Sequence, residues 1–80
     1  MKIKISRHAK RRAKLYSIPE SVIIEILKGK ELSSGVQEII ETVEEFKYPL
    51  KIVVTVEDDT ITVITNYPLK KGRKNESLLR

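Results

Sequence analysis

The 80-residue sequence contains no cysteine and no tryptophan, and it has a single histidine. Without cysteine the chain can form neither a disulfide nor a thiolate metal site, as is usual for proteins of a reducing compartment. No apolar run reaches the ~20 residues that a membrane-spanning helix needs. The charged start, Met1 to Ile5, lacks the apolar stretch of a signal peptide. We therefore expect a cytoplasmic protein.

Several kinds of catalytic site are also missing from the sequence. Its three glycines are isolated, so they form no glycine-rich loop that could surround a phosphate. Histidine, cysteine and acidic residues are not grouped at the spacing of metal ligands. We find no nucleophile elbow of the hydrolase type. The sequence therefore predicts neither a metal nor another cofactor.

Charge is unevenly distributed in a chain whose net charge is +5. From Met1 to Tyr16 there are basic residues and no acidic one, and a second basic cluster lies at 70–74. Acidic residues gather between these two segments, at 31–59. A separated positive region attracts polyanions and speeds their encounter, which favours RNA as a partner. The alternative is an ordinary charged surface that only keeps the protein soluble.

Short motifs predict that the chain begins with a helical hairpin at about 6–28. Ser6 is a typical N-cap for a helix that runs to about Tyr16. Pro19 favours the first position of a second helix, and Gly29 is a natural end for it.

The segment 36–46 is ambiguous. Val36, Ile39, Ile40 and Val43 have the spacing of an apolar helix face, whereas Ile40, Thr42, Glu44 and Phe46 fit a strand less well. Periodicity alone therefore predicts a helix here.

Two runs rich in β-branched residues, 50–56 and 60–67, predict an antiparallel hairpin with its turn at 57–59. On simple alternation, Thr65 and Tyr67 should share a face with Ile61 and Val63. The residues expected in the core are Val22, Ile26, Leu27, Ile52, Val54, Ile61 and Val63.

His8 and Arg12 are the strongest candidates for chemistry. They lie four residues apart near the start of the first predicted helix, so they share one of its sides. In RNA cleavage a histidine can move a proton near neutral pH, while an arginine neutralises charge on the reacting phosphate. The alternative is that His8 is simply an exposed residue of a basic helix.

Further candidates lie on the hairpin. Lys51 begins its first strand and Tyr67 ends its second, so the two should lie near each other. A lysine can hold a phosphate, and a tyrosine can stack on a base. Residues expected to bind RNA without catalysing are Lys10, Arg11, Thr65, Lys70, Lys71 and Arg73.

The stretch from Ser6 to Ala13 resembles the opening motif of a widespread family of small domains of unknown function, in which His-Ala is followed by Arg-Met and an Arg-Gly-Ile turn. Residues 18–20 continue the similarity into a second helix, and 63–68 resemble the family's closing strand. Ala13 replaces the usual Met. Tyr16 and Ser17 replace the usual Arg-Gly, which removes one basic group.

That family is similar to the RelE and BrnT toxins of toxin–antitoxin systems. The resemblance implies an α+β fold like that of microbial ribonucleases, with two N-terminal helices packed on a small twisted antiparallel sheet. It implies a strand at 36–43, contrary to the periodicity. It also implies RNA cleavage, often on the ribosome, and neutralisation by a co-encoded antitoxin protein. Carried over by position, the family pattern includes His8, Arg12, Lys51, Thr65 and Tyr67.

We therefore expect one RelE-like domain over residues 1–80, with the helical hairpin at about 6–28, the sheet at about 36–68 and a basic tail at 69–80. The expected function is that of a metal-independent endoribonuclease toxin, with His8, Arg12, Lys51 and Tyr67 as its catalytic residues. The alternative is a non-catalytic module of the same fold that binds RNA or a protein without cutting. A third possibility, from the same toxin resemblance, is a poison of another target such as gyrase.

Overall fold

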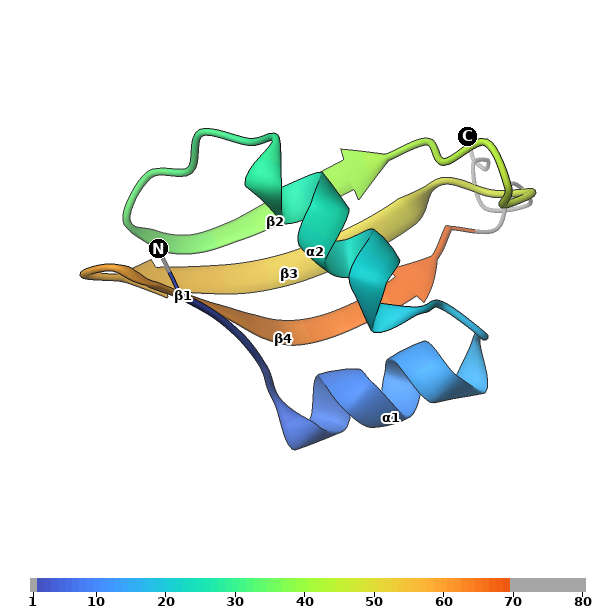
Figure 1. Cartoon of the computed structure of the whole chain (residues 1–80), viewed down its shortest axis with the longest axis horizontal. Coiled ribbons are helices and arrows are strands. Elements are labelled where there is room, and N and C mark those ends of the chain that lie inside the picture. Colours follow the sequence, from blue (N-terminus) through green and yellow to red (C-terminus); the bar gives the residue numbers. More distant parts are fainter. Residues whose placement is uncertain (1, 70–80) are drawn as a thin grey trace, which may run out of the picture.

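The computed structural model describes residues 2–69. Its elements are β1 (Lys2–Ile5), α1 (Arg7–Leu15), α2 (Glu20–Lys28), β2 (Gly35–Glu41), β3 (Leu50–Glu57) and β4 (Thr60–Pro68). The four strands form one sheet in the order β1-β4-β3-β2 (Figure 1). The predicted α+β architecture with two N-terminal helices is confirmed.

The sheet is mixed rather than antiparallel, which corrects the prediction. β3 is antiparallel to both of its neighbours, but β1 runs parallel to β4. The pairing begins beside the hairpin turn, where the Lys2 N–H donates to the Asp59 carbonyl at 2.7 Å, and it ends where the Ser6 N–H donates to the Val63 carbonyl at 3.1 Å. Because β1 runs parallel to β4, the chain passes from the end of β1 directly into α1. The helix then packs along the same edge of β4 that β1 occupies.

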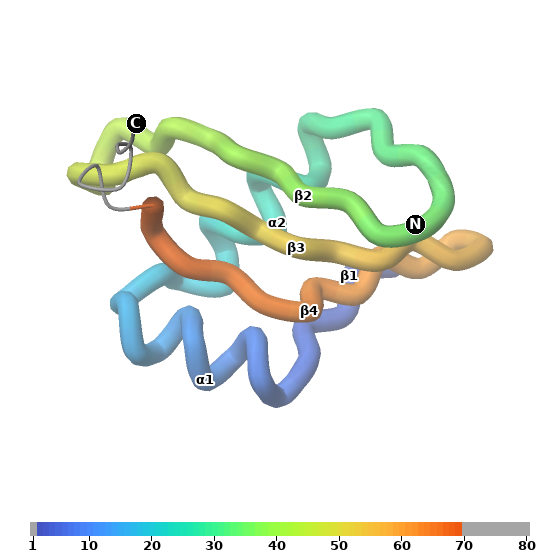
Figure 2. The backbone as a smooth tube through the Cα atoms, turned by 180° about the vertical axis from the view of Figure 1, so that it is seen from behind, coloured from blue at the N-terminus to red at the C-terminus, as the bar shows by residue number. Residues whose placement is uncertain are grey.

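The two helices occupy different positions against the sheet. α2 lies across one face, whereas α1 lies along the edge of β4 beyond the end of β1 (Figures 1 and 2). No helix of residues 2–69 covers the other face, which we call the open face. From β1 to β2, its side chains include Lys2, Lys4, Thr60, Thr62, Thr65, Tyr67, Lys51, Val53, Thr55, Glu57, Val36, Glu38 and Ile40.

α1 begins as predicted. The Ser6 hydroxyl accepts a hydrogen bond from the Ala9 N–H at 3.1 Å, which is the contact that makes serine a good N-cap. Ala9 and Ala13 are buried, because their small side chains let α1 approach β4 closely.

α1 ends in a Schellman motif, with a serine where glycine is usual. Ser17 has a left-handed backbone with φ of 57°. The Ile18 N–H donates to the Ala13 carbonyl at 2.8 Å, and the Ser17 N–H donates to the Lys14 carbonyl at 3.2 Å. These two hydrogen bonds stabilise a reversal of the chain direction, and the reversal places Ile18 in the core.

α2 begins one residue later than predicted. Pro19 is its N-cap, with an extended backbone, and the helix starts at Glu20. Gly29 is the C-cap at φ of −87°, so the helix stops there as predicted but does not use glycine's left-handed freedom.

The helix predicted by periodicity at 36–46 is wrong, because β2 is a strand as the resemblance implies. Ile39 is buried opposite Ile52, while Val36 and Ile40 lie on the open face at 69% and 57% exposure. A helix would have gathered these three residues on one side. The strand divides them between its two faces.

The β3–β4 hairpin contains a bulge that alternation did not predict. Ile64 has no partner on β3, because Thr65 pairs with Val53 and Val63 pairs with Val54. The extra residue reverses the alternation, so Thr65 and Tyr67 lie on the opposite face from Ile61 and Val63. The prediction that these four residues share a face is therefore wrong.

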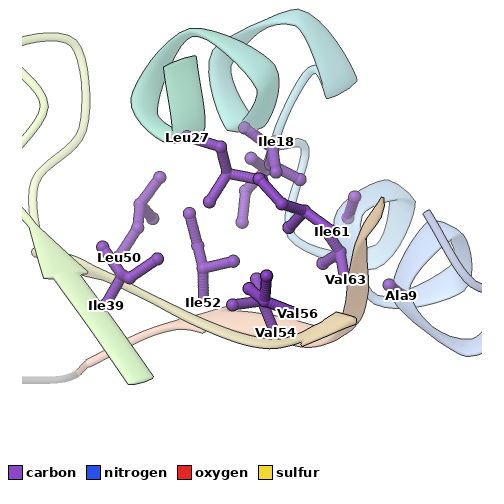
Figure 3. Close-up of a cluster of buried hydrophobic side chains, with 12 residues drawn as sticks. Ala9, Ile18, Leu27, Ile39, Leu50, Ile52, Val54, Val56, Ile61 and Val63 are labelled. Atoms are coloured by element: carbon purple, nitrogen blue, oxygen red, sulfur yellow. The ribbon is translucent and has the colours of Figure 1, made fainter. Parts of the chain in front are cut away.

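The core lies between α2, α1 and the covered face of the sheet (Figure 3). Five predicted core residues are buried, whereas Val22 and Ile26 are only half-buried. α2 instead points Ile23 and Leu27 into the core, one helical turn apart. The buried apolar residues are Ala9, Ala13, Ile18, Ile23, Leu27, Ile39, Leu50, Ile52, Val54, Val56, Ile61 and Val63.

Among residues 2–69, no helix is long and apolar enough to cross a membrane.

Candidate nucleic-acid interface

His8 and Arg12 lie together on one side of α1, as their spacing predicts. A shallow depression on this side is lined by His8, Arg11, Arg12, Lys14 and Leu15. His8 is exposed, so a ligand can reach its imidazole. The depression therefore presents one histidine among three cations.

Arg12 is partly fixed in position. One of its guanidinium nitrogens donates to the Tyr16 hydroxyl at 3.4 Å. Tyr16 itself packs against the core. The contact holds Arg12 beside the body of the domain, while its remaining donors can bind a phosphate. Lys10 is exposed and does not line the depression.

Lys51 and Tyr67 are neighbours on the open face, which confirms their predicted proximity. They are paired across β3 and β4, with the Lys51 Nζ 5.9 Å from the centre of the Tyr67 ring. Thr65 lies on the same face two residues earlier, opposite Val53. This group offers an ammonium, an aromatic face and a hydroxyl to a ligand.

Glu38 of β2 is also part of this group. Its carboxylate lies 3.2 Å from the Lys51 Nζ. The hydrogen bond that Lys51 donates to the Glu38 carboxylate raises the pKa of Lys51, and the nearby Tyr67 adds to the effect. Lys51 is therefore cationic at neutral pH, but a phosphate must compete with Glu38 for it.

The two groups come from different elements. Within residues 2–69, no hydrogen bond or ion pair joins the His8–Arg12 side of α1 to Lys51, Thr65 or Tyr67. The predicted tail residues Lys70, Lys71 and Arg73 lie outside the described residues.

Sequence reasoning missed two features of this region. Lys2 and Lys4 share the open face with Thr62, a placement that the Lys-Ile-Lys-Ile alternation could have shown. Asn66 is buried beside α1, and only the bulge places it there. The part of the chain that the structure describes holds no group of three or more metal-ligating side chains.

Comparisons with protein-family models, with curated proteins and with solved structures give no match.

Proposed function

We propose that this domain binds RNA on the side shared by α1 and the open face, and that it cleaves the bound strand as a metal-independent endoribonuclease of the RelE-like toxin kind. One observation carries the proposal. By helix geometry, the direction of α1 turns His8 and Arg12 towards the side of the molecule that carries the half-buried Lys51, Thr65 and Tyr67.

This orientation follows from the hand of the helix. In Figure 1, α1 runs from left to right below β4, and α2 lies in front of the sheet, so the open face is at the rear. Ala9 and Ala13 are buried towards the sheet. Each residue of a right-handed helix is turned by about 100° from the next. His8 and Arg12 each precede one of these alanines, so from this rotation we infer that they face the side of the open face.

The residues suit the chemistry of metal-free RNA cleavage. The 2′-hydroxyl attacks the neighbouring phosphorus and loses a proton to a base, and the departing 5′-oxygen gains a proton from an acid. His8 can perform one of these transfers, and Arg12 can neutralise the phosphate as its charge grows. Lys51 would bind a second phosphate, and Tyr67 would stack on a base or take part in the other proton transfer.

The remaining predicted residues would extend the binding surface. Lys10, Arg11 and Thr65 would contact the RNA around the reacting phosphate, and the tail cations Lys70, Lys71 and Arg73 would add affinity. As part of the same proposal, a co-encoded antitoxin protein would neutralise the activity, and the RNA would be met on the ribosome.

A second candidate is a module that binds RNA without cutting it. It is favoured by the depression beside His8, which only α1 residues line. If no group from the sheet reaches the phosphate that His8 contacts, the second acid or base is missing and cleavage does not occur.

The binding step is tested by measuring the affinity for a single-stranded RNA oligonucleotide across a salt series. Affinity should fall steeply with salt, because each neutralised phosphate of a single strand adds about 0.7 to the logarithmic slope. Arg12→Ala, which removes one phosphate contact, should lower this slope by about 0.7. The matched control is Lys28→Ala, which removes the same charge from the exposed end of α2. A salt-independent affinity, or equal effects of the two variants, would contradict the proposed surface.

A further inference from the structure

Asn66 is the single buried polar residue among residues 2–69, and it is only half satisfied. Its side chain has no exposed surface. Its Nδ2 donates to the Ala9 carbonyl at 3.2 Å, while its Oδ1 has no hydrogen-bond partner. A buried acceptor without a partner costs stability, and an apolar side chain would avoid that cost. The core around it is otherwise apolar, so stability alone gives no reason for asparagine here.

The bulge at Ile64 explains how Asn66 comes to face α1. Without the extra residue, Asn66 would point to the open face, and Thr65 and Tyr67 would point inward. One backbone irregularity therefore turns Asn66 towards α1 and presents Thr65 and Tyr67 to a ligand.

Three hydrogen bonds join this bulged segment to the first turn of α1. The Ser6 N–H donates to the Val63 carbonyl at 3.1 Å, the Ser6 hydroxyl donates to the Ile64 carbonyl at 3.2 Å, and Asn66 donates to Ala9. His8 lies between Ser6 and Ala9. The turn that carries His8 is thus tied to the strand segment that carries Thr65 and Tyr67.

We propose that Asn66 is a positioning residue, which fixes His8 relative to Tyr67 through the Ala9 carbonyl and is retained for this role at a cost in stability. The inference rests on the proposed endoribonuclease function. Proton transfer requires the acid and base to be held within a fraction of an ångström, and a displacement of about 1 Å can cost about 100-fold in rate. Simple binding of a phosphate tolerates such a displacement far better.

The test compares Asn66→Leu with the wild-type protein in thermal unfolding, in RNA binding and in RNA cleavage. A labelled single-stranded RNA oligonucleotide is the substrate, and its 2′-deoxy analogue, which cannot be cleaved, reports binding. We expect Asn66→Leu to unfold at the same temperature or higher and to bind the analogue within about twofold. Its kcat should fall about 100-fold with little change in KM. Ile39→Val, a buried change on β2 away from α1, should leave kcat unchanged.

Amide hydrogen exchange supplies a readout that does not depend on RNA. Loss of the bond to Ala9 should speed exchange in α1 about 10-fold relative to β3. Asn66→Ala, which also removes the donor to Ala9, serves if Asn66→Leu does not fold, with the same expectations for kcat and exchange. Wild-type kcat in a folded Asn66 variant, or unchanged exchange in α1, would overturn the positioning role. A wild-type protein that binds RNA but never cleaves it would contradict the proposed function instead, and exchange would then decide the inference about α1.

Discussion

Replacing Ser17 by glycine should stabilise the domain, because this residue closes α1 in the left-handed conformation that glycine adopts without strain. Ser17 is exposed, with φ of 57°. Its backbone N–H forms part of the Schellman motif, and glycine retains that group. The substitution therefore changes the backbone energy at one position and little else.

The magnitude follows from two opposing effects. Relieving the contact between Cβ and the carbonyl in the left-handed region contributes about 1–2 kcal/mol. The greater freedom of glycine in the unfolded chain offsets about 0.5–1 kcal/mol of this gain. The net stabilisation should be about 0.5–1 kcal/mol, which for a domain of this size raises Tm by about 2–8 °C.

The assay is thermal unfolding followed by circular dichroism, with Ser34→Gly as the matched control. Ser34 is an exposed loop serine outside the left-handed region, so glycine there should slightly destabilise the fold. A Tm for Ser17→Gly at or below that of Ser34→Gly would refute the reasoning about the end of α1.

The remaining predictions concern the core and the Lys51–Glu38 pair. Leu27→Ala should lower the free energy of unfolding by about 2–5 kcal/mol in a denaturant titration, because Leu27 is 1% exposed. Leu15→Ala, at 69% exposure, should change it by less than about 0.5 kcal/mol. Glu38→Gln should strengthen RNA binding in a fluorescence titration, since a phosphate no longer competes for Lys51; an unchanged or weaker affinity would contradict this. The pKa of Lys51 is raised above its ordinary value of 10.5, so the pair's stabilisation is fully present below that pH and is lost as pH rises through the raised value. The free energies of unfolding of the wild type and of Glu38→Gln, measured as a function of pH, should therefore differ by a constant amount between pH 6 and about 9 and converge above about 10.5. A difference that grew above pH 10.5 would count against the stabilising role of the Lys51–Glu38 pair.

Local signals in the sequence predicted most of the elements. Ser6 marks the start of α1 and Gly29 marks the end of α2. Both could be predicted, because capping depends on the residue and its immediate neighbours. The hairpin turn could also be predicted from the sequence, since β-branched runs flank its acidic residues. These features need no information about the rest of the fold.

The predictions were wrong where contacts between distant parts of the chain determine the secondary structure or the face on which a residue lies. Val36, Ile39 and Ile40 have helical spacing, but pairing with β3 places Ile39 in the core and leaves the other two exposed. The bulge at Ile64 has no signature in an alternating run, so the faces of Thr65 and Tyr67 were assigned wrongly. The parallel pairing of β1 depends on which strand edge is left free, which four residues cannot specify.

For the candidate site, the sequence predicted which residues lie next to each other in two pairs. It did not predict how the two pairs are placed relative to each other. His8 with Arg12 follows from helical spacing, and Lys51 with Tyr67 follows from hairpin pairing. How the two pairs lie relative to each other depends on the position of α1 at the edge of β4. That position rests on Ala9, Ala13 and the buried Asn66, none of which suggests a site in the sequence.

The most direct test of the account is cleavage of a single-stranded RNA by the purified wild-type protein without added metal, compared with His8→Ala, with and without ribosomes. A general acid or base contributes about 100–10,000-fold to rate, so His8→Ala should cut more slowly by that factor. Its RNA affinity and Tm should be unchanged, because the His8 side chain is exposed and Arg12 and Lys51 supply the phosphate contacts of the proposed surface. Cleavage by His8→Ala at the wild-type rate would contradict the role of His8. A wild-type protein that binds RNA and leaves it intact under both conditions would contradict the endoribonuclease and favour the binding module.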